Sequence, residues 1–291
     1  MKQQIQKAFR RFGYEVHRVQ GHGRASTKTS LLPTLAINPI WPLPRKGKEL
    51  STQQIREEFA KHDAWHYAYE FEGGLSFPRR YGKDQPPQDP NRPLQRFRHL
   101  MPPLLAAHNG SLEGKRVLDI ACNSGFWSLQ CALRGAQVVG FDARQENIDQ
   151  ANLVKRIVGL DNVEFNVLDF WDMSPQSLGG TFDVVLCLGF LNHLPYPIQA
   201  LQLIKNMSRK HVLLDTMLYR STDSAVALEW QQSDDIRHAK RYGIVAIPTE
   251  NAVELILREI GVSESFEIPI VTPDAPEDYR EQSRGCWLIT V

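Results

Sequence analysis

The chain has 291 residues, enough for one large domain or two small ones. Hydrophobic residues make up 42% and charged residues 23%, proportions that are typical of globular proteins and exclude wholesale disorder. No run of about 18 apolar residues is present, which excludes a transmembrane helix, and the first residues, MKQQIQKAFRRFGYEVHR, lack the apolar stretch of a secretory signal. The four cysteines form no CxxC pair, which argues against a disulfide framework or a cysteine zinc site and favours the reducing cytoplasm.

The net charge of +1 is unevenly distributed along the chain. Residues 1–50 contain ten Lys and Arg but only two Glu, a local charge of +8, so the remaining residues carry −7. A basic arm of this kind either binds a polyanion such as nucleic acid or packs on the acidic remainder of the chain. We favour packing, and nucleic acid is the second interpretation.

Residues 1–18 have the pattern of a basic amphipathic helix. Apolar side chains follow the i, i+3, i+4, i+7 spacing, with Lys and Arg between them: Ile5, Ala8, Phe9 and Phe12. Such a helix lies either on an anionic membrane surface or on the protein itself. Docking on the protein is the favoured interpretation.

The segments that follow alternate between loop and helix. Residues 20–48 are rich in Gly, Ser, Thr and Pro, which predicts a linker or an extended covering segment. A helix is expected over 51–68, with Ser51 or Thr52 as its cap. Residues 78–93 are expected to form a loop.

From about residue 95, short apolar strands alternate with helices. Strands are expected over 116–121, 137–142, 162–167, 182–188, 211–216, 266–271 and 286–291. Helices are expected over 125–134, 145–158, 196–206 and 249–260. Seven strands with helices between them indicate an α/β fold, an open, doubly wound, Rossmann-like sheet covered by helices on both faces.

We divide the chain into residues 1–95, a basic helix, linker and cap segment, and residues 96–291, which form the sheet domain. The front segment has too few contiguous apolar periods for a core of its own. It nevertheless contains large aromatic side chains that need burial, among them Trp41, Trp65, Tyr67, Tyr69, Phe71 and Phe77. We therefore expect it to cover the strand ends as a cap. The insertion 217–246 contains no motif.

Acidic residues mark three successive strands. Asp119 lies inside the first strand, Asp142 ends the second, and Asp169 follows the third. Ligands of doubly wound sheets bind at the carboxyl ends of the strands. A carboxylate at Asp142 accepts both hydroxyl protons of a ribose, and Asp169 beside the aromatic Phe170 suits an adenine. Each aspartate alone has a structural explanation in orienting a loop, capping a helix or forming a turn, but together they indicate an adenosine-containing cofactor.

The turn after the first strand, Ala121-Cys122-Asn123-Ser124-Gly125, contains one glycine and no basic residue. A dinucleotide needs the G-x-G-x-x-G cradle for its pyrophosphate, so NAD is not expected. The segment VLDIACNSGFWSL instead resembles motif I of class I S-adenosylmethionine (SAM) methyltransferases, with Ala121 and Asn123 at usual glycine positions. The resemblance implies SAM as cofactor, S-adenosylhomocysteine (SAH) as product, and cofactor contacts from Asp119, Ala121, Asn123, Gly125, Asp142, Ala143, Asp169, Phe170 and Leu188.

The resemblance extends over about residues 65–291. FDVVLCLGFLNHLPYPIQAL resembles the fourth strand and the next helix of the methyltransferase fold, and SRGCWLITV resembles its antiparallel last strand. WHYAYEFEGGLSFP resembles the front segment of a subgroup that includes the bacterial tRNA wobble-uridine carboxymethyltransferase and relatives acting on sugars or small molecules. In that tRNA enzyme a tyrosine helps to hold a carboxylated cofactor. Asn192 stands at this position here, which favours ordinary SAM.

His193, after the fourth strand, is the candidate general base for a hydroxyl acceptor; the alternative is that it orients a loop beside the cofactor. The side chains expected to line the acceptor, unless the aromatic ones serve only in packing, are Trp65, His66, Tyr67 and Asn192. Arg98 or Arg96 is expected to pair with the methionine carboxylate of SAM, with a solvated surface position as the alternative. No metal is expected, because the His62 and His66 pair has neither an HExxH glutamate nor a third ligand.

These features predict a SAM-dependent methyltransferase that acts on a hydroxyl or amine of a small molecule or glycan. One alternative is an RNA-modifying enzyme, acting at a tRNA wobble uridine through the basic arm. Another is a non-catalytic SAM-binding protein. The sequence specifies neither the acceptor nor the oligomeric state.

Overall fold

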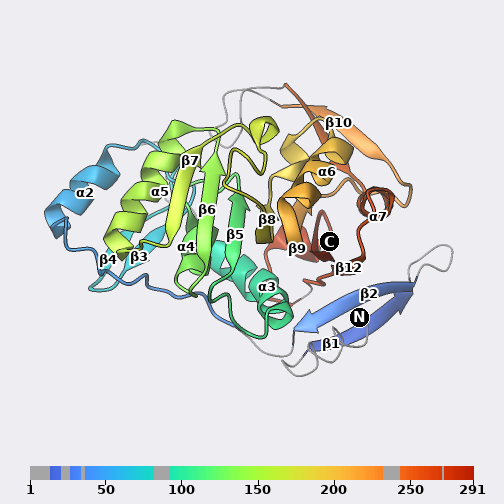
Figure 1. Ribbon diagram of the computed structural model, residues 1–291, viewed down its shortest axis with the longest axis horizontal. Coiled ribbons are helices and arrows are strands. Elements are labelled where there is room, and N and C mark those ends of the chain that lie inside the picture. Colours follow the sequence, from blue (N-terminus) through green and yellow to red (C-terminus); the bar gives the residue numbers. More distant parts are fainter. Residues whose placement is uncertain (1–13, 21–26, 34–36, 82–91, 232–242, 271) are drawn as a thin grey trace.

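The computed structural model describes residues 14–20, 27–33, 37–81, 92–231, 243–270 and 272–291 (Figure 1). A nine-stranded sheet has the order β1-β2-β12-β13-β9-β8-β5-β6-β7. Its strands are β1 (Tyr14–Gln20), β2 (Thr27–Pro33), β5 (Arg116–Ile120), β6 (Gln137–Asp142), β7 (Val163–Val167), β8 (Phe182–Leu188), β9 (Ser208–Met217), β12 (Glu264–Glu267) and β13 (Arg284–Thr290). Two small sheets pair β3 (Tyr69–Phe71) with β4 (Leu75–Phe77), and β10 (Val226–Trp230) with β11 (Ile244–Pro248).

The helices connect these strands. They are α2 (Thr52–Ala60), α3 (Arg92–Ala107), α4 (Phe126–Ala132), α5 (Gln145–Val158), α6 (Pro197–Met207), α7 (Glu250–Glu259) and α8 (Glu277–Arg280). Two short 3-10 helices, η1 (Phe170–Asp172) and η2 (Leu191–His193), follow β7 and β8.

The expected seven-stranded sheet is present as the part β12-β13-β9-β8-β5-β6-β7. Strands β5 to β9 are parallel to their neighbours within that group, whereas β13 runs antiparallel to both β9 and β12. β5 lies between β6 and β8, so the strand order reverses at the end of β5. In a doubly wound sheet this reversal separates the loops and leaves room for a ligand.

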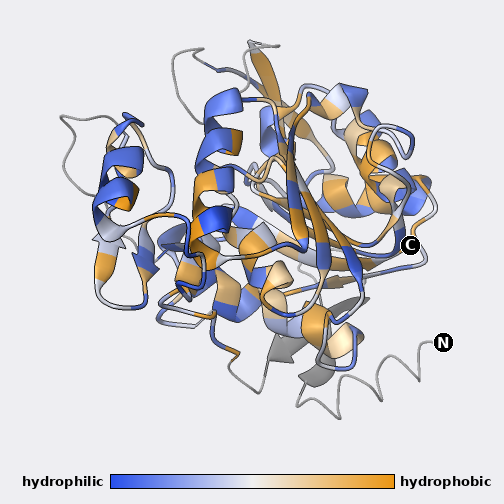
Figure 2. Cartoon of the chain, turned by 60° about the vertical axis from the view of Figure 1, so that its left-hand side comes forward, coloured by the Kyte–Doolittle hydropathy of each residue, from blue (hydrophilic) through white to orange (hydrophobic). Residues whose placement is uncertain are grey.

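Helices cover both faces of this sheet. α3, α4 and α5 pack on one face together with α2, and α6 and α7 pack on the other. Neighbouring residues along a strand point to opposite faces, so Val117 and Leu118 belong to the two different apolar clusters. Figure 2 shows the apolar residues gathered on the strands and on the sheet-facing sides of the helices. The strand ends are therefore anchored in two packed cores.

The front segment forms α2 and the short hairpin β3–β4. α2 begins as expected with a capping box, in which Ser51 accepts from the Gln54 backbone N–H (3.2 Å) and the Gln54 side chain accepts from the Ser51 N–H (2.9 Å). The helix ends at Ala60, before the expected residue 68, because the chain then turns back and stacks Trp65 on Phe59 with ring centroids 4.2 Å apart. Of the six aromatic side chains named from the sequence, four are buried: Trp65, Tyr67, Tyr69 and Phe71.

Helix α3 begins at Arg92, inside the segment expected to be a loop, and residues 82–91 lie outside the described part of the chain. The helix runs to Ala107, so the division of the chain at residues 95 and 96 lies within it. No break in secondary structure therefore marks the division at residues 95 and 96.

The expectation of a helix over residues 1–18 is wrong for residues 14–18, which belong to β1; residues 1–13 lie outside the described part. β1 pairs antiparallel with β2, which occupies part of the expected linker, and β2 joins the sheet beside β12 through Ser30 and Glu267. An edge strand such as β12 presents unpaired backbone groups, and Val and Thr favour extended chain. This non-local pairing accounts for the extended conformation of residues 14–18.

The insertion 217–246 contains the strand β10 and the start of β11, which no motif indicated. The two strands pair antiparallel, with Trp230 opposite Ile244. β12 covers Glu264–Glu267 instead of the expected 266–271.

Candidate functional site

A cavity of about 540 Å³ opens where β5, β6 and β8 end. One side of it, the strand-end side, consists of residues at or after the ends of β5 to β8: Ala121, Asn123, Phe141, Asp142, Ala143, Arg144, Asn147, Leu168, Asp169, Phe170, Trp171 and Leu188. The other, the hairpin side, combines the front segment, α3, η2, the hairpin β10–β11 and the C-terminal region: His66, Tyr67, Arg79, Arg92, Arg96, Gly189, Phe190, Asn192, His193, Leu194, Met217, Glu229, Gln231, Val245, Ile247, Asp278 and Arg284. The volume of the whole cavity lies in the range of small-molecule binding sites.

The turn after β5 has an unusual backbone. Ala121 and Asn123 adopt left-handed φ values of 53° and 51°, and Gly125 has a φ of 87°. The Asn123 side chain accepts from the Ser124 N–H (2.7 Å), which is the local bonding that lets asparagine tolerate this region. From the front segment, the Tyr69 hydroxyl donates to the Ser124 carbonyl oxygen at 2.5 Å. The turn is therefore stabilised by one hydrogen bond between its own residues and by another from the front segment.

Asp142 ends β6 and lines the cavity. Its carboxylate accepts from the backbone N–H groups of Asn123 (3.1 Å) and Arg144 (3.0 Å) and from the Asn147 amide (3.0 Å). Burial raises the pKa of Asp142, and these three hydrogen bonds oppose that rise. The carboxylate is thus fixed in direction at the point where β5 and β6 diverge.

Asp169 and Phe170 follow β7. The Asp169 carboxylate accepts from the Trp171 N–H at 2.9 Å and so caps η1. The Phe170 ring is buried, with its centroid 5.3 Å from that of Phe190. A carboxylate and an aromatic face are thereby presented side by side on the strand-end side.

Two of the expected cofactor residues of motif I support the turn from behind the cavity. Asp119 is 2% exposed and accepts from the Ser128 hydroxyl at 2.6 Å; burial raises its pKa to about 7. Gly125 begins α4, and a Cβ there would lie 2.8 Å from the Phe165 ring. Neither residue lines the cavity. Asp119 fixes the start of α4 through this hydrogen bond, and Gly125 leaves room for the Phe165 ring.

Of the two arginines considered for a carboxylate partner, Arg96 lines the cavity and Arg98 does not. Arg98 donates to the Asn38 side chain at 3.1 Å on an exposed surface. Arg96 is 7% exposed and lies on the buried face of α3. In the sequence, Arg96 falls on the same helical face as the apolar Leu100, and this spacing could have distinguished it from the exposed Arg98.

An ion network that the sequence reasoning missed supports Arg96. Asp215 on β9 is fully buried and accepts from Arg96 (2.8 Å) and from Arg284 (2.7 Å), and the hydroxyl of Tyr279 also donates to it. Burial alone raises the pKa of Asp215, but the charges of Arg96 and Arg284 lower it to about 2. Arg284 also pairs with Asp278 at 3.0 Å. The network fixes two guanidinium groups of the hairpin side.

The front segment contributes two of its three expected residues to the cavity. His66 and Tyr67 line it, whereas Trp65 is buried beneath, where its indole N–H donates to the Phe59 carbonyl oxygen at 3.2 Å. Burial raises the pKa of Tyr67 to about 12, so its hydroxyl is neutral. His66 does not lie on a helix with His62, because α2 ends at Ala60.

Asn192 and His193 lie on η2 and both line the cavity. The side-chain oxygen Oδ1 of Asn192 accepts a hydrogen bond from the Met217 N–H (3.3 Å), which directs this side chain toward β9. Nδ1 of His193 lies 2.9 Å from Nε2 of Gln231, which follows β10. The hairpin therefore contacts the residue proposed from the sequence as a base.

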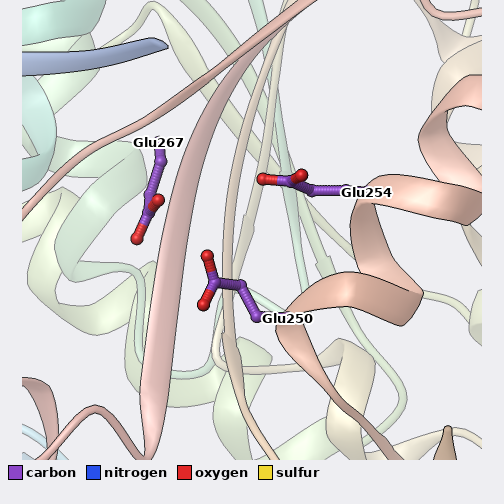
Figure 3. A group of neighbouring side chains, drawn as sticks. All are labelled: Glu250, Glu254 and Glu267. Carbon is purple, nitrogen blue, oxygen red and sulfur yellow. The ribbon is translucent and has the colours of Figure 1, made fainter. Parts of the chain in front are cut away.

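One group of three carboxylates lies away from the cavity. Glu250 and Glu254 of α7 face Glu267 of β12, with one oxygen of each residue within 4.8 Å of the others (Figure 3). None of the three lines the cavity, and an acidic cluster alone does not define a metal site. Within the described ranges, no helix has the length and hydropathy needed to cross a membrane.

Comparisons with known proteins agree with this geometry. The methyltransferase domain family matches residues 111–254. The chain is 27% identical over 193 residues to tRNA U34 carboxymethyltransferase of Helicobacter hepaticus, covering 64% of this chain and 58% of that protein. It is 28% identical over 128 residues to ubiquinone biosynthesis O-methyltransferase of Acinetobacter baylyi, covering 43% and 53%. The chain thus spans little more than half the length of these curated relatives.

A solved structure shows the same fold. The N-terminal domain of EvdMO1, crystallised in the presence of SAH and D-fucose, matches with a TM-score of 0.61 at 21% identity, over 82% of this chain and 93% of that one. The seven-stranded order, the antiparallel β13 and the cavity at the end of β5 are the features that the fold requires. Residues 111–254 therefore match a methyltransferase domain, and the chain has the fold of SAM-dependent methyltransferases of class I.

Proposed function

We propose that this protein transfers a methyl group from SAM to a hydroxyl or amine of a small molecule or glycan and releases SAH. The observation that carries the proposal is the convergence of Asp142, Asp169 and the turn 121–125 on one cavity. Two carboxylates suit the hydroxyls of a ribose and the amino group of an adenine, and the turn offers no basic side chain to a pyrophosphate. The names of the relatives, which describe methyl or carboxymethyl transfer, support the same class of reaction.

On the strand-end side, the Asp142 carboxylate holds the ribose, while Asp169 and Phe170 receive the adenine. From the hairpin side, Arg96 pairs with the methionine carboxylate in place of Arg98, because of these two arginines only Arg96 lines the cavity. Small or apolar contacts come from Ala121, Asn123, Ala143 and Leu188. When bound, SAM supplies a sulfonium that activates the methyl group. The protein then has to align the acceptor and exclude water.

On the hairpin side, His66, Tyr67 and Asn192 surround the acceptor, and His193 contacts its nucleophilic atom. We assign the role of a cap to the front segment, residues 37–81, since it places His66 and Tyr67 in the cavity wall. Its buried aromatic rings give it an apolar attachment to the sheet domain; the ring centroids of Tyr67 and of Phe126 in α4, for example, are 5.6 Å apart. A cap in this position keeps water from the reacting atoms.

Two measurements on the purified protein test the methyltransferase proposal. Mass spectrometry of co-purified ligands is expected to detect SAM or SAH, and methyl-labelled SAM is expected to label at least one member of a panel of hydroxyl and amine acceptors. Failure to bind SAM and SAH would contradict the proposal. SAM binding without transfer to any acceptor would favour the non-catalytic alternative instead.

The cap is tested by deleting residues 1–91, which leaves α3 and its Arg96 intact. We expect the shortened chain to bind SAH more weakly and to become poorly soluble, because the apolar surface under the front segment is exposed. In the full chain, SAM is expected to slow proteolysis within residues 34–48. A shortened chain that binds SAH with unchanged affinity and methylates the same acceptor would show that the front segment is a separate module.

Modification of tRNA is the second candidate function. It is favoured by the match to tRNA U34 carboxymethyltransferase over 64% of the chain and by the charge of residues 1–50. An RNA-binding enzyme loses affinity steeply as salt rises, because phosphate contacts release counterions. Tight, salt-sensitive tRNA binding would favour this function over a small-molecule acceptor.

A further inference from the structure

The hairpin β10–β11 brings Gln231 against His193. Gln231 and His193 both line the cavity, and Nε2 of Gln231 lies 2.9 Å from Nδ1 of His193. The main chain of Gln231 is itself anchored, since its N–H donates to the Gly243 carbonyl oxygen at 2.8 Å. We propose that Gln231 is a positioning residue that fixes the tautomer of His193, with the proton of the neutral ring on Nε2.

The polarity of this hydrogen bond follows from the atoms involved. An amide nitrogen only donates, so Gln231 donates and Nδ1 of His193 accepts with its lone pair. A neutral imidazole carries one proton, which then resides on Nε2. Because Nδ1 is engaged by Gln231, any hydrogen bond that His193 makes to an acceptor comes from Nε2, and the ring donates it.

This tautomer changes the chemical role of His193, and that consequence rests on the proposed function. A ring that donates from Nε2 stabilises a lone pair or negative charge on the acceptor and does not remove its proton. The acceptor oxygen then reaches the site already ionised and uses its lone pair to form the new O–CH₃ bond. The S–CH₃ bond breaks and its electron pair stays on sulfur, so no proton moves in this step. The arrangement favours acidic hydroxyls such as phenols, or carboxylates, over the aliphatic hydroxyls of sugars.

The tautomer can be measured directly, without knowledge of the acceptor. Long-range ¹H–¹⁵N correlation spectra of protein labelled with ¹⁵N-histidine distinguish protonated from unprotonated ring nitrogens. The spectra are recorded at about pH 9, above the usual histidine pKa of about 6.5, with His193 assigned by its loss in His193→Asn. In the wild-type protein we expect an unprotonated Nδ1 and a protonated Nε2.

Three variants test the role of Gln231. In Gln231→Glu the carboxylate only accepts, so the pattern is expected to reverse, with the proton on Nδ1. In Gln231→Leu neither ring nitrogen of His193 has this partner, so the proton is expected to exchange between Nδ1 and Nε2 and the two ¹⁵N signals are expected to average. The matched control is Glu229→Gln on β10, two residues before Gln231; Glu229 also lines the cavity, and this variant is expected to leave the pattern of the wild type.

A proton on Nδ1 in the wild type, or a pattern that Gln231→Glu leaves unchanged, would overturn the proposal. SAH binding, followed by calorimetry, separates this outcome from a failure of the proposed function. The spectra of the ligand-free protein report the tautomer even if SAH does not bind, and absence of SAH binding would count against the methyltransferase function alone.

Discussion

The two sides of the cavity are built in different ways. The strand-end side takes its residues from positions at or just after consecutive strands, such as Asp142 at the end of β6 and Asp169 after β7. The hairpin side assembles residues from five separate regions, and Arg96 meets Asp215 across 119 positions of sequence. The first side follows from the order of the parallel strands, whereas the second depends on contacts between residues far apart in the sequence. We therefore expect the strand-end side to hold the ribose and adenine of the cofactor, and the hairpin side, apart from Arg96, to define the acceptor.

The largest expected effect comes from breaking the ion network behind the hairpin side. Asp215→Asn leaves Arg96 and Arg284 buried without their shared carboxylate, which costs about 3–5 kcal/mol of unfolding free energy. Urea unfolding measures this loss. The control is Arg209→Gln, which removes an exposed ion pair to Asp183 and is expected to cost at most about 1 kcal/mol. Equal stability of the two variants would show that the network is not a support for this side.

A second prediction concerns a histidine pair at the amino-terminal end of β9, away from the cavity, and serves as a reference for changes in either side of the cavity. His108 and His211 are buried together, 2.9 Å apart, and burial lowers the pKa of His108 to about 4 and that of His211 to about 3. Because the unfolded chain binds protons near pH 6.5 and the folded one does not, stability falls as the pH drops from 6.5 toward 4.

Between pH 6.5 and pH 4.5, we expect the unfolding free energy of His108→Gln to fall by about 2 kcal/mol less than that of the wild type. The SAH affinity at pH 7.5 is expected to be unchanged. Urea titrations at several pH values, combined with calorimetry, measure both quantities. A variant with the same pH slope as the wild type would mean that His108 titrates normally in the folded protein.

A third change tests how the front segment supports the strand-end side. Tyr69→Phe keeps the buried ring but leaves the Ser124 carbonyl oxygen without its donor, which costs about 1–2 kcal/mol. Both stability and SAH affinity are expected to fall, since Ser124 lies in the turn beside Asn123. Tyr219→Phe, at a tyrosine that is 48% exposed, serves as the control and should change stability by no more than about 0.5 kcal/mol. A loss of stability without any loss of SAH affinity would separate the turn from cofactor binding.

The smallest expected effect concerns the same turn. Ala121 has a φ of 53°, a conformation that costs a residue with a Cβ about 1 kcal/mol. Ala121→Gly removes this cost but gains freedom in the unfolded chain, so a net stabilisation of about 0.5 kcal/mol is expected in urea unfolding. Ala121→Val, with a β-branched side chain at the same φ, is expected to destabilise. If glycine destabilises as well, the left-handed conformation is not the source of strain at this position.

The same contrast explains how much the sequence could predict. β6 and α5 have the predicted bounds, because their apolar periods and caps are local. The three acidic strand ends were found by the same local reasoning, although Asp119 supports the turn without lining the cavity. Asp215, a charged residue inside the apolar strand HVLLDT, also stands out in the sequence. Its partners could not be predicted in the same way, because they lie on other elements, such as Arg96 on α3.

The remaining features depend on tertiary structure. Gln231 reaches His193 over 38 positions only because β10 and β11 pair, and no local period encodes that contact. The extended conformation of residues 14–18 likewise depends on pairing with β2. Long-range pairing therefore explains both the wrong helix assignment at residues 14–18 and the contact of Gln231 with His193, which the sequence did not predict.

The most direct test of the central claim is calorimetric titration of SAH and NAD into the wild type, Asp142→Ala and Glu229→Ala. If the strand-end side holds the cofactor, Asp142→Ala weakens SAH binding by about 2–3 kcal/mol, roughly 30- to 150-fold, because the charge-assisted hydrogen bonds to the ribose are lost. Glu229→Ala, on the hairpin side, leaves SAH affinity within about twofold, a change below about 0.4 kcal/mol, and NAD does not bind the wild type. Undiminished SAH binding by Asp142→Ala, or saturable binding of NAD, would contradict the account.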